Sequence, residues 1–135
     1  MNATPVYPVG LRLRGRRVVV VGGGQVAHRR VAGLLEAGAE VTVVSPVVTP
    51  ALEALVAPGS LIWVHRRYES GDLEGAWYAV AATDDPEVNA AVTAEADAGR
   101  IFCARADDRW PGSRRWNSIG RRRGRRRCGR RPPPR

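Results

Sequence analysis

Three consecutive glycines interrupt the apolar part of the chain and form the pattern Gly22-x-Gly24-x-x-Ala27. Glycine lets a backbone turn tightly and approach a ligand closely, and the free amide groups at the start of a helix attract anions. A diphosphate suits this spacing, with Gly22 making the turn, Gly24 admitting the anion and Ala27 letting the helix pack. The alternative is a glycine-rich turn of another doubly wound protein that binds no dinucleotide.

The glycines lie between a predicted strand and a predicted helix, which is the context that gives the pattern meaning. Residues 18–21 are four consecutive valines, typical of a buried parallel strand. From Gln25 the apolar positions recur at helical spacing until Gly38, a residue suited to ending a helix. The sequence therefore predicts a strand, a glycine turn and a helix in succession.

The same alternation continues along the chain. Two more helices are predicted, one beginning at Pro50 and one at Pro86, because residues able to cap a helix precede each proline. Alternating strands and helices indicate an α/β fold, a Rossmann-type doubly wound parallel sheet of five strands within residues 1–108. Its other strands are predicted at 41–44, 61–64, 76–82 and 101–104, with Trp63, Trp77 and Tyr78 in the core.

The second predicted strand ends without a charged group. In dinucleotide-binding folds, a residue at this position often binds the ribose of the cofactor. A carboxylate is expected there for NAD, and an arginine nearby for the 2′-phosphate of NADP. This chain has Ser45, Pro46 and Val47 instead, so local chemistry does not separate the two cofactors. The Ser45 side chain and the backbone of the next two residues remain candidates for contacting the ribose.

The net charge of +9 is distributed unevenly. Residues 1–108 contain 10 Arg and 13 acidic residues, a net charge of −3, whereas residues 109–135 contain 12 Arg and no acid. The second segment has no apolar periodicity, and we expect a disordered basic tail. Such a tail could bind nucleic acid nonspecifically, which makes a nucleic-acid-binding protein one alternative function.

Metal, disulfide and membrane sites have no support in the sequence. Cys103 and Cys128 are the only cysteines, and His28 has no partner at ligand spacing, so no metal site is predicted. No stretch approaches the roughly 18 apolar residues of a membrane span, and no signal-peptide pattern is present. We therefore expect a cytoplasmic protein.

Three segments, 20–30, 34–39 and 81–89, together resemble the N-terminal module of siroheme synthases and of stand-alone precorrin-2 dehydrogenases. The likeness covers about residues 6–108, in matching order and spacing. It implies NAD-dependent oxidation of precorrin-2, a tetrapyrrole, to sirohydrochlorin. In bifunctional members of the family, insertion of ferrous iron follows. A homodimer is also implied.

The resemblance further implies which residues contact the NAD cofactor. They lie in the glycine turn, at the end of the second strand and around the fourth strand. Carried over position by position, they are Gly22, Gly24, Gln25, Val26, Pro46, Val47, Thr83, Asp84 and Asn89.

The family's key carboxylate follows the fifth strand and matches Asp107. A carboxylate there could accept the proton released when the macrocycle is oxidised, or guide the iron. Read from position alone, Asp107 and Asp108 are simply solvated turn acids. Arg29 matches a basic position of the family, and together with Arg30 it could meet tetrapyrrole carboxylates.

The basic tail departs from the family, whose members continue into a dimerisation region and a small helical domain. The chain contains no Lys, and its tail is rich in Arg, Gly, Pro and Trp, which GC-rich DNA encodes when read out of frame. We therefore hypothesise that residues from about 109 onward are a frameshifted translation. A further alternative is a dinucleotide-sensing module that regulates a partner without catalysis.

Overall fold

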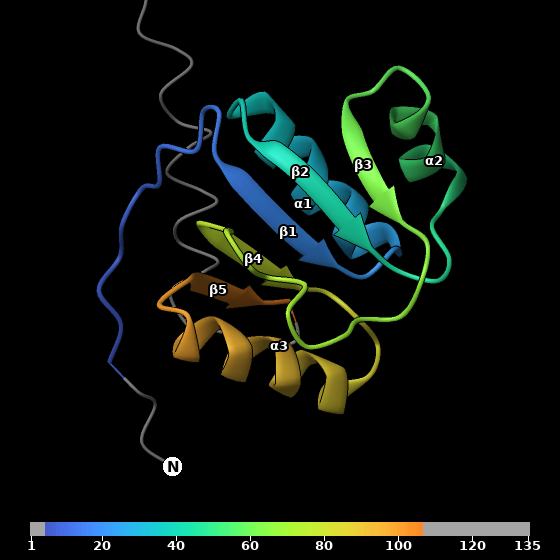
Figure 1. Cartoon of the computed structure of the whole chain (residues 1–135). Helices are drawn as coiled ribbons and strands as arrows, with labels where there is room; N and C mark the ends of the chain where they lie inside the picture. Colours follow the sequence, from blue (N-terminus) through green and yellow to red (C-terminus); the bar gives the residue numbers. More distant parts are fainter. Residues whose placement is uncertain (1–4, 107–135) are drawn as a thin grey trace, which may run out of the picture.

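The computed structural model describes residues 5–106, which form a five-stranded parallel sheet with the strand order β3-β2-β1-β4-β5. The predicted α/β, doubly wound arrangement is confirmed (Figure 1). Residues 109–135, and with them the expected disorder of the tail, lie outside the described part of the chain. The elements are β1 Arg17–Val21, α1 Gln25–Glu36, β2 Glu40–Val44, α2 Pro50–Val56, β3 Leu61–Val64, β4 Tyr78–Ala81, α3 Pro86–Ala98 and β5 Phe102–Arg105.

The sheet is covered on both faces, which explains why its central strands are continuous valine runs rather than alternating ones. Helices α1 and α2 pack against the face that carries Val18 and Val20, and α3 packs against the face that carries Val19 and Val21 (Figure 1). All four valines of β1 are at most 1% exposed. The carboxyl end of this rigid strand leads directly into the glycine turn.

Helix α1 ends where the sequence predicts, and a glycine explains why. Gly38 has a φ of +80°, a left-handed conformation that favours glycine. The N–H of Gly38 donates to the carbonyl of Leu35 and the N–H of Ala39 donates to that of Leu34, both at 3.0 Å. These two bonds form a Schellman motif, which satisfies carbonyls at the helix end.

The connection between β3 and β4, residues 65–77, contains no helix. It crosses the sheet on the face that α3 also covers and inserts Leu73, which is fully buried, into the core there. Within residues 5–106, no helix is long and apolar enough to cross a membrane.

The prediction for the start of the fourth strand was partly wrong. Strand β4 begins at Tyr78 rather than at residue 76, and Trp77 is 56% exposed instead of lying in the core. The Arg16 guanidinium lies 3.8 Å from the centre of the exposed Trp77 ring and makes a cation–π contact with it. Trp63 and Tyr78 are partly buried against the core, as predicted.

Candidate functional site

A cleft of about 830 Å³ lies at the carboxyl ends of the strands. It spans the point between β1 and β4 where the strand order reverses, which is where doubly wound sheets bind ligands. Of the nine residues predicted to contact the cofactor, eight line this cleft. These eight are Gly22, Gly24, Gln25, Val26, Pro46, Val47, Thr83 and Asp84.

Two glycines bring the loops at the sheet edge into contact. Gly22 has a φ of +131°, and a Cβ built on it would lie 2.6 Å from the carbonyl carbon of Ala82. A Cβ on Gly23 would lie 2.7 Å from the Ser45 hydroxyl oxygen. The turn therefore packs against the ends of both β4 and β2. The pattern Gly22-x-Gly24-x-x-Ala27 assigns Gly23 no role, because the need for glycine at that position arises from a distant loop.

Gly24 differs from both, because a Cβ built on it would have no atom within 4 Å. Gly24 lies in the turn that lines the cleft, so the open space beside it is available to a ligand. A side chain there would occupy the volume that a bound group needs. This is the geometry expected of the glycine that lets a diphosphate approach the backbone.

The start of α1 has no side-chain cap, unlike the starts of the other two helices. The Thr49 hydroxyl accepts a hydrogen bond from the amide of Leu52 in α2, and the Asp85 carboxylate accepts one from the amide of Glu87 in α3. Helix α1 has Gly24 as its N-cap residue and no acidic residue in its first turn. Gln25 and Val26, the first two residues of α1, line the cleft, and helix-start amides without a side-chain cap suit the oxygens of a diphosphate.

The end of β2 forms the second wall of the cleft. Ser45 is 7% exposed, and its hydroxyl donates a 2.6 Å hydrogen bond to the carbonyl of Val47. The backbone carbonyl of Ser45 accepts a 2.8 Å bond from the indole of Trp63. Ser45 therefore holds the loop in shape, and Pro46 and Val47 are exposed to the cleft.

Asn89, the ninth predicted contact, does not line the cleft. It is 1% exposed, and its side-chain oxygen accepts bonds from the amide of Thr83 at 3.1 Å and from the Thr83 hydroxyl at 2.8 Å. Its side-chain amide donates to the carbonyl of Thr83 at 3.0 Å. Asn89 therefore positions Thr83, which does line the cleft.

Arg67 and Tyr68 also line the cleft, although no motif singled them out. Both lie in the 65–77 connection, far along the chain from the glycine turn. Burial, aided by the negative charge of Glu95, raises the pKa of Tyr68 to about 12. The phenol is therefore protonated at neutral pH, and its hydroxyl group interacts with the Glu95 carboxylate of α3.

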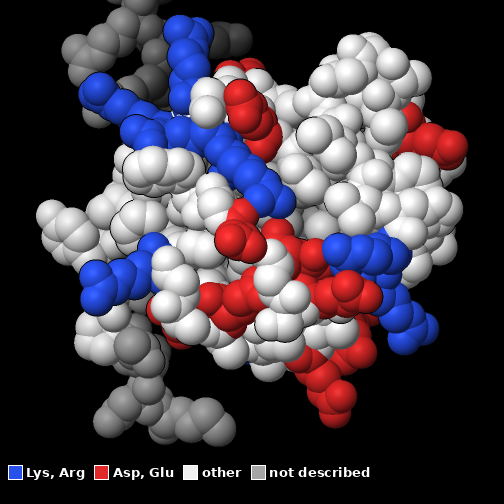
Figure 2. All heavy atoms as spheres, viewed as in Figure 1, with Lys and Arg blue, Asp and Glu red and all other residues white. Residues whose placement is uncertain are grey.

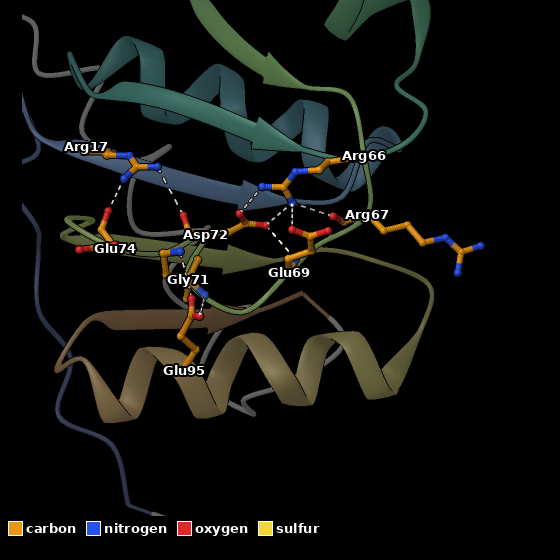
Figure 3. Close-up of polar contacts among 9 residues, drawn as sticks. Arg17, Arg66, Arg67, Glu69, Gly71, Asp72, Glu74 and Glu95 are labelled. Atoms are coloured by element: carbon orange, nitrogen blue, oxygen red, sulfur yellow. Dashed lines mark hydrogen bonds and ion pairs between the residues drawn. The ribbon is translucent and has the colours of Figure 1, made fainter.

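Polar contacts hold the 65–77 connection against the sheet and α3 (Figure 3). Arg66 donates two hydrogen bonds to the carboxylate of Asp72, at 2.8 and 2.6 Å, and Arg17 donates to backbone carbonyls of the same connection. The Glu95 carboxylate of α3 accepts hydrogen bonds from the backbone amides of Gly71 and Leu73. Figure 2 shows acidic side chains gathered over this connection and α3.

The Arg66–Asp72 pair predicts acid-sensitive stability. The hydrogen bond from Arg66, followed by that from the amide of Glu69, holds the pKa of Asp72 below its ordinary value. A lowered folded pKa stabilises the fold above the unfolded pKa of about 3.9, and this contribution is lost as the pH falls through the folded pKa. Asp72→Asn should lower the free energy of unfolding by about 2 kcal/mol at neutral pH.

Denaturant titrations at about pH 7 and about pH 3 measure this effect. The difference between wild type and Asp72→Asn should shrink at the lower pH, because the stabilisation that comes from the lowered pKa of Asp72 declines once the pH falls below the unfolded value of about 3.9. Glu36→Gln, at an exposed position of α1, is the matched control. An equal difference at both pH values would contradict the assigned role of the ion pair.

Asp107, the predicted catalytic residue, lies outside the described residues. Its neighbour Ala106 lines the cleft, and the Ala106 amide donates a 2.9 Å bond to the carbonyl of Ala81. Within residues 5–106 there is no cluster of three His, Cys, Asp or Glu side chains that could hold a metal ion. His28 and Arg29 line a second, smaller depression beside α1 rather than the cleft.

Comparison with known proteins shows which protein family contains this domain. Residues 9–113 match a family model described as "Putative NAD(P)-binding". The chain belongs to this NAD(P)-binding family. Membership confirms the prediction of a nicotinamide dinucleotide as cofactor, and the glycine turn of the NAD(P)-binding domain fits the diphosphate of such a molecule.

Relatives of this NAD(P)-binding domain confirm the resemblance found in the sequence. The chain is 46% identical over 101 residues to siroheme synthase 1 of Aeromonas salmonicida and 46% identical over 102 residues to siroheme synthase of Chromobacterium violaceum. These matches cover 75% and 76% of the chain but 22% of each relative. The chain therefore spans only about a fifth of the length of these synthases.

Two solved structures are also similar. One is SirC, a precorrin-2 dehydrogenase, with a TM-score of 0.70 and 36% identity, over 80% of this chain and 53% of that one. The other is the tRNA N6-threonylcarbamoyladenosine dehydratase TcdA of E. coli, with a TM-score of 0.56 and 16% identity, over 67% of this chain and 50% of that one. At that identity, the second likeness shows the fold alone.

Proposed function

We propose that this chain binds NAD in the cleft and serves in the oxidation of precorrin-2 to sirohydrochlorin. The observation that carries the proposal is the pairing of open space at Gly24 with the uncapped start of α1 at the carboxyl edge of the sheet. The similarity to siroheme synthases and to a precorrin-2 dehydrogenase supports the choice of substrate.

The chain's own groups would bind and orient the reactants. The first amides of α1 bind the diphosphate, and Thr83, held by Asn89, forms the wall beside it. The nicotinamide, when bound, accepts the hydride. Because the second strand reads the ribose nearest the adenine, the nicotinamide half of the cleft lies towards β4 and β5. The tetrapyrrole would bind at that end.

Asp107 is proposed as the general base. Oxidation of precorrin-2 removes a hydride and a proton, and the carboxylate of Asp107 would accept the proton. Asp107 follows Ala106 in the sequence, and Ala106 lines the cleft. Insertion of ferrous iron requires loss of pyrrole protons, and the same carboxylate would serve there if this chain carries the second activity. This proposal also includes a homodimer, a cytoplasmic location and a division of the chain at residue 108. The family match extends five residues beyond that division, to residue 113.

The proposal is tested by mixing the full chain with NAD and precorrin-2 under anaerobic conditions and following the absorbance of NADH. We expect NADH to form only when both substrates are present, and sirohydrochlorin to appear in equal amount. Binding of NAD without any NADH would contradict the catalytic proposal and would favour the dinucleotide-sensing alternative.

A further inference from the structure

Arg67 is the only basic residue among the described residues that line the cleft. Its side chain is exposed and extends away from the acidic cluster, whereas the side chain of its neighbour Arg66 is held by Asp72 (Figure 3). Only the backbone carbonyl of Arg67 takes part in that cluster, as the acceptor of a 2.9 Å bond from Arg66. The Arg67 guanidinium is therefore available to a ligand in the cleft.

The strand order places Arg67 in the adenosine half of the cleft. It follows β3 by three residues, and β3 is the edge strand beside β2. In a doubly wound sheet, the ribose of the adenosine lies at the end of the second strand. Arg67 and the 45–47 loop both line the cleft on that side, away from β4 and β5.

The same region lacks the group that would reject a phosphorylated ribose. A carboxylate at the end of the second strand binds the free 2′-hydroxyl and repels a 2′-phosphate. Here the position is taken by Ser45, whose hydroxyl donates to Val47, and by Pro46. The acids that line the cleft, Asp84 and Asp85, follow β4 on the other side of the glycine turn.

We propose that the cleft accepts NADP as well as NAD and that Arg67 binds the 2′-phosphate. The inference rests on the proposed dinucleotide binding and adds a specificity-determining residue to it. A guanidinium presents paired N–H donors that match two phosphate oxygens, and such charge-assisted bonds are stronger than neutral ones. Because the phosphate is absent from NAD, Arg67 contributes to binding of NADP alone.

Calorimetric titration of the full chain with NAD and with NADP tests the proposal. We expect wild type to bind both, and Arg67→Gln to weaken NADP binding by about tenfold while changing NAD binding by less than about twofold. Arg12→Gln, at an exposed arginine outside the cleft, is the matched control and should change neither affinity. Raising the salt concentration should weaken NADP binding more than NAD binding in wild type.

The outcomes separate this inference from the proposed function. If the chain binds NAD but not NADP, the role of Arg67 is wrong and the proposed function stands. If Arg67→Gln weakens both cofactors equally, Arg67 contacts a part that they share, and the specificity proposal is overturned. If neither cofactor binds, both proposals fail together.

Discussion

Gly22→Ala is expected to destabilise the fold by about 3 kcal/mol or more, because two costs combine. The φ of +131° is a conformation that residues with a side chain rarely adopt. The added methyl would also lie 2.6 Å from the carbonyl carbon of Ala82 and 3.2 Å from the amide nitrogen of Thr83. The backbone there cannot retreat freely, because the amide of Ala82 donates a 2.8 Å bond to Val21 within the sheet.

Denaturant unfolding of wild type and variant measures this loss. Gly24→Ala is the matched control, since it adds the same methyl group two residues later, at a φ of −86° and in open space. Its free energy of unfolding should stay within about 1 kcal/mol of wild type. Similar stability of the Gly22 variant and wild type would show that the turn is not packed as described.

Asp107→Ala is expected to lower the rate of precorrin-2 oxidation by at least about 100-fold, the loss typical of removing a general base. NAD affinity should change by less than about twofold, because the proposed role concerns the substrate proton and not the cofactor. Steady-state kinetics and calorimetry on the same preparations separate the two effects.

Asp108→Ala serves as the control, because it removes a neighbouring charge without removing the proposed base. Its turnover should stay close to that of wild type. If the two variants lose activity equally, or if the Asp107 variant remains active, then Asp107 is not the base and the interpretation of both residues as solvated turn acids is favoured.

The strands and helices could be predicted closely because their signals are local. The valines of β1 and β2 form short runs bounded by glycine or proline, and each helix begins at a recognisable residue. The start of β4 could not be placed in this way. Ala76 and Trp77 continue an apolar run, yet the indole is exposed under Arg16, a contact between segments about sixty positions apart. Composition does not reveal such pairing.

The same distinction applies to the site. The glycine turn and the start of α1 are contiguous, so their role could be inferred from the spacing of Gly22, Gly24 and Ala27. Arg67 reaches the cleft because contacts from Arg17 of β1 and from Glu95 of α3 hold its connection against the sheet. The burial of Asn89 behind Thr83 likewise depends on how α3 packs.

Titration of the full chain with NAD, for wild type and for Gly24→Ala, is the most direct test of the central claim that the glycine turn and the first amides of α1 bind the diphosphate. Wild type should bind NAD, and the variant, although folded, should bind it at least about tenfold more weakly, because its methyl group keeps the phosphates from the backbone amides. Equal affinity in the two proteins, or no binding by wild type, would contradict the claim.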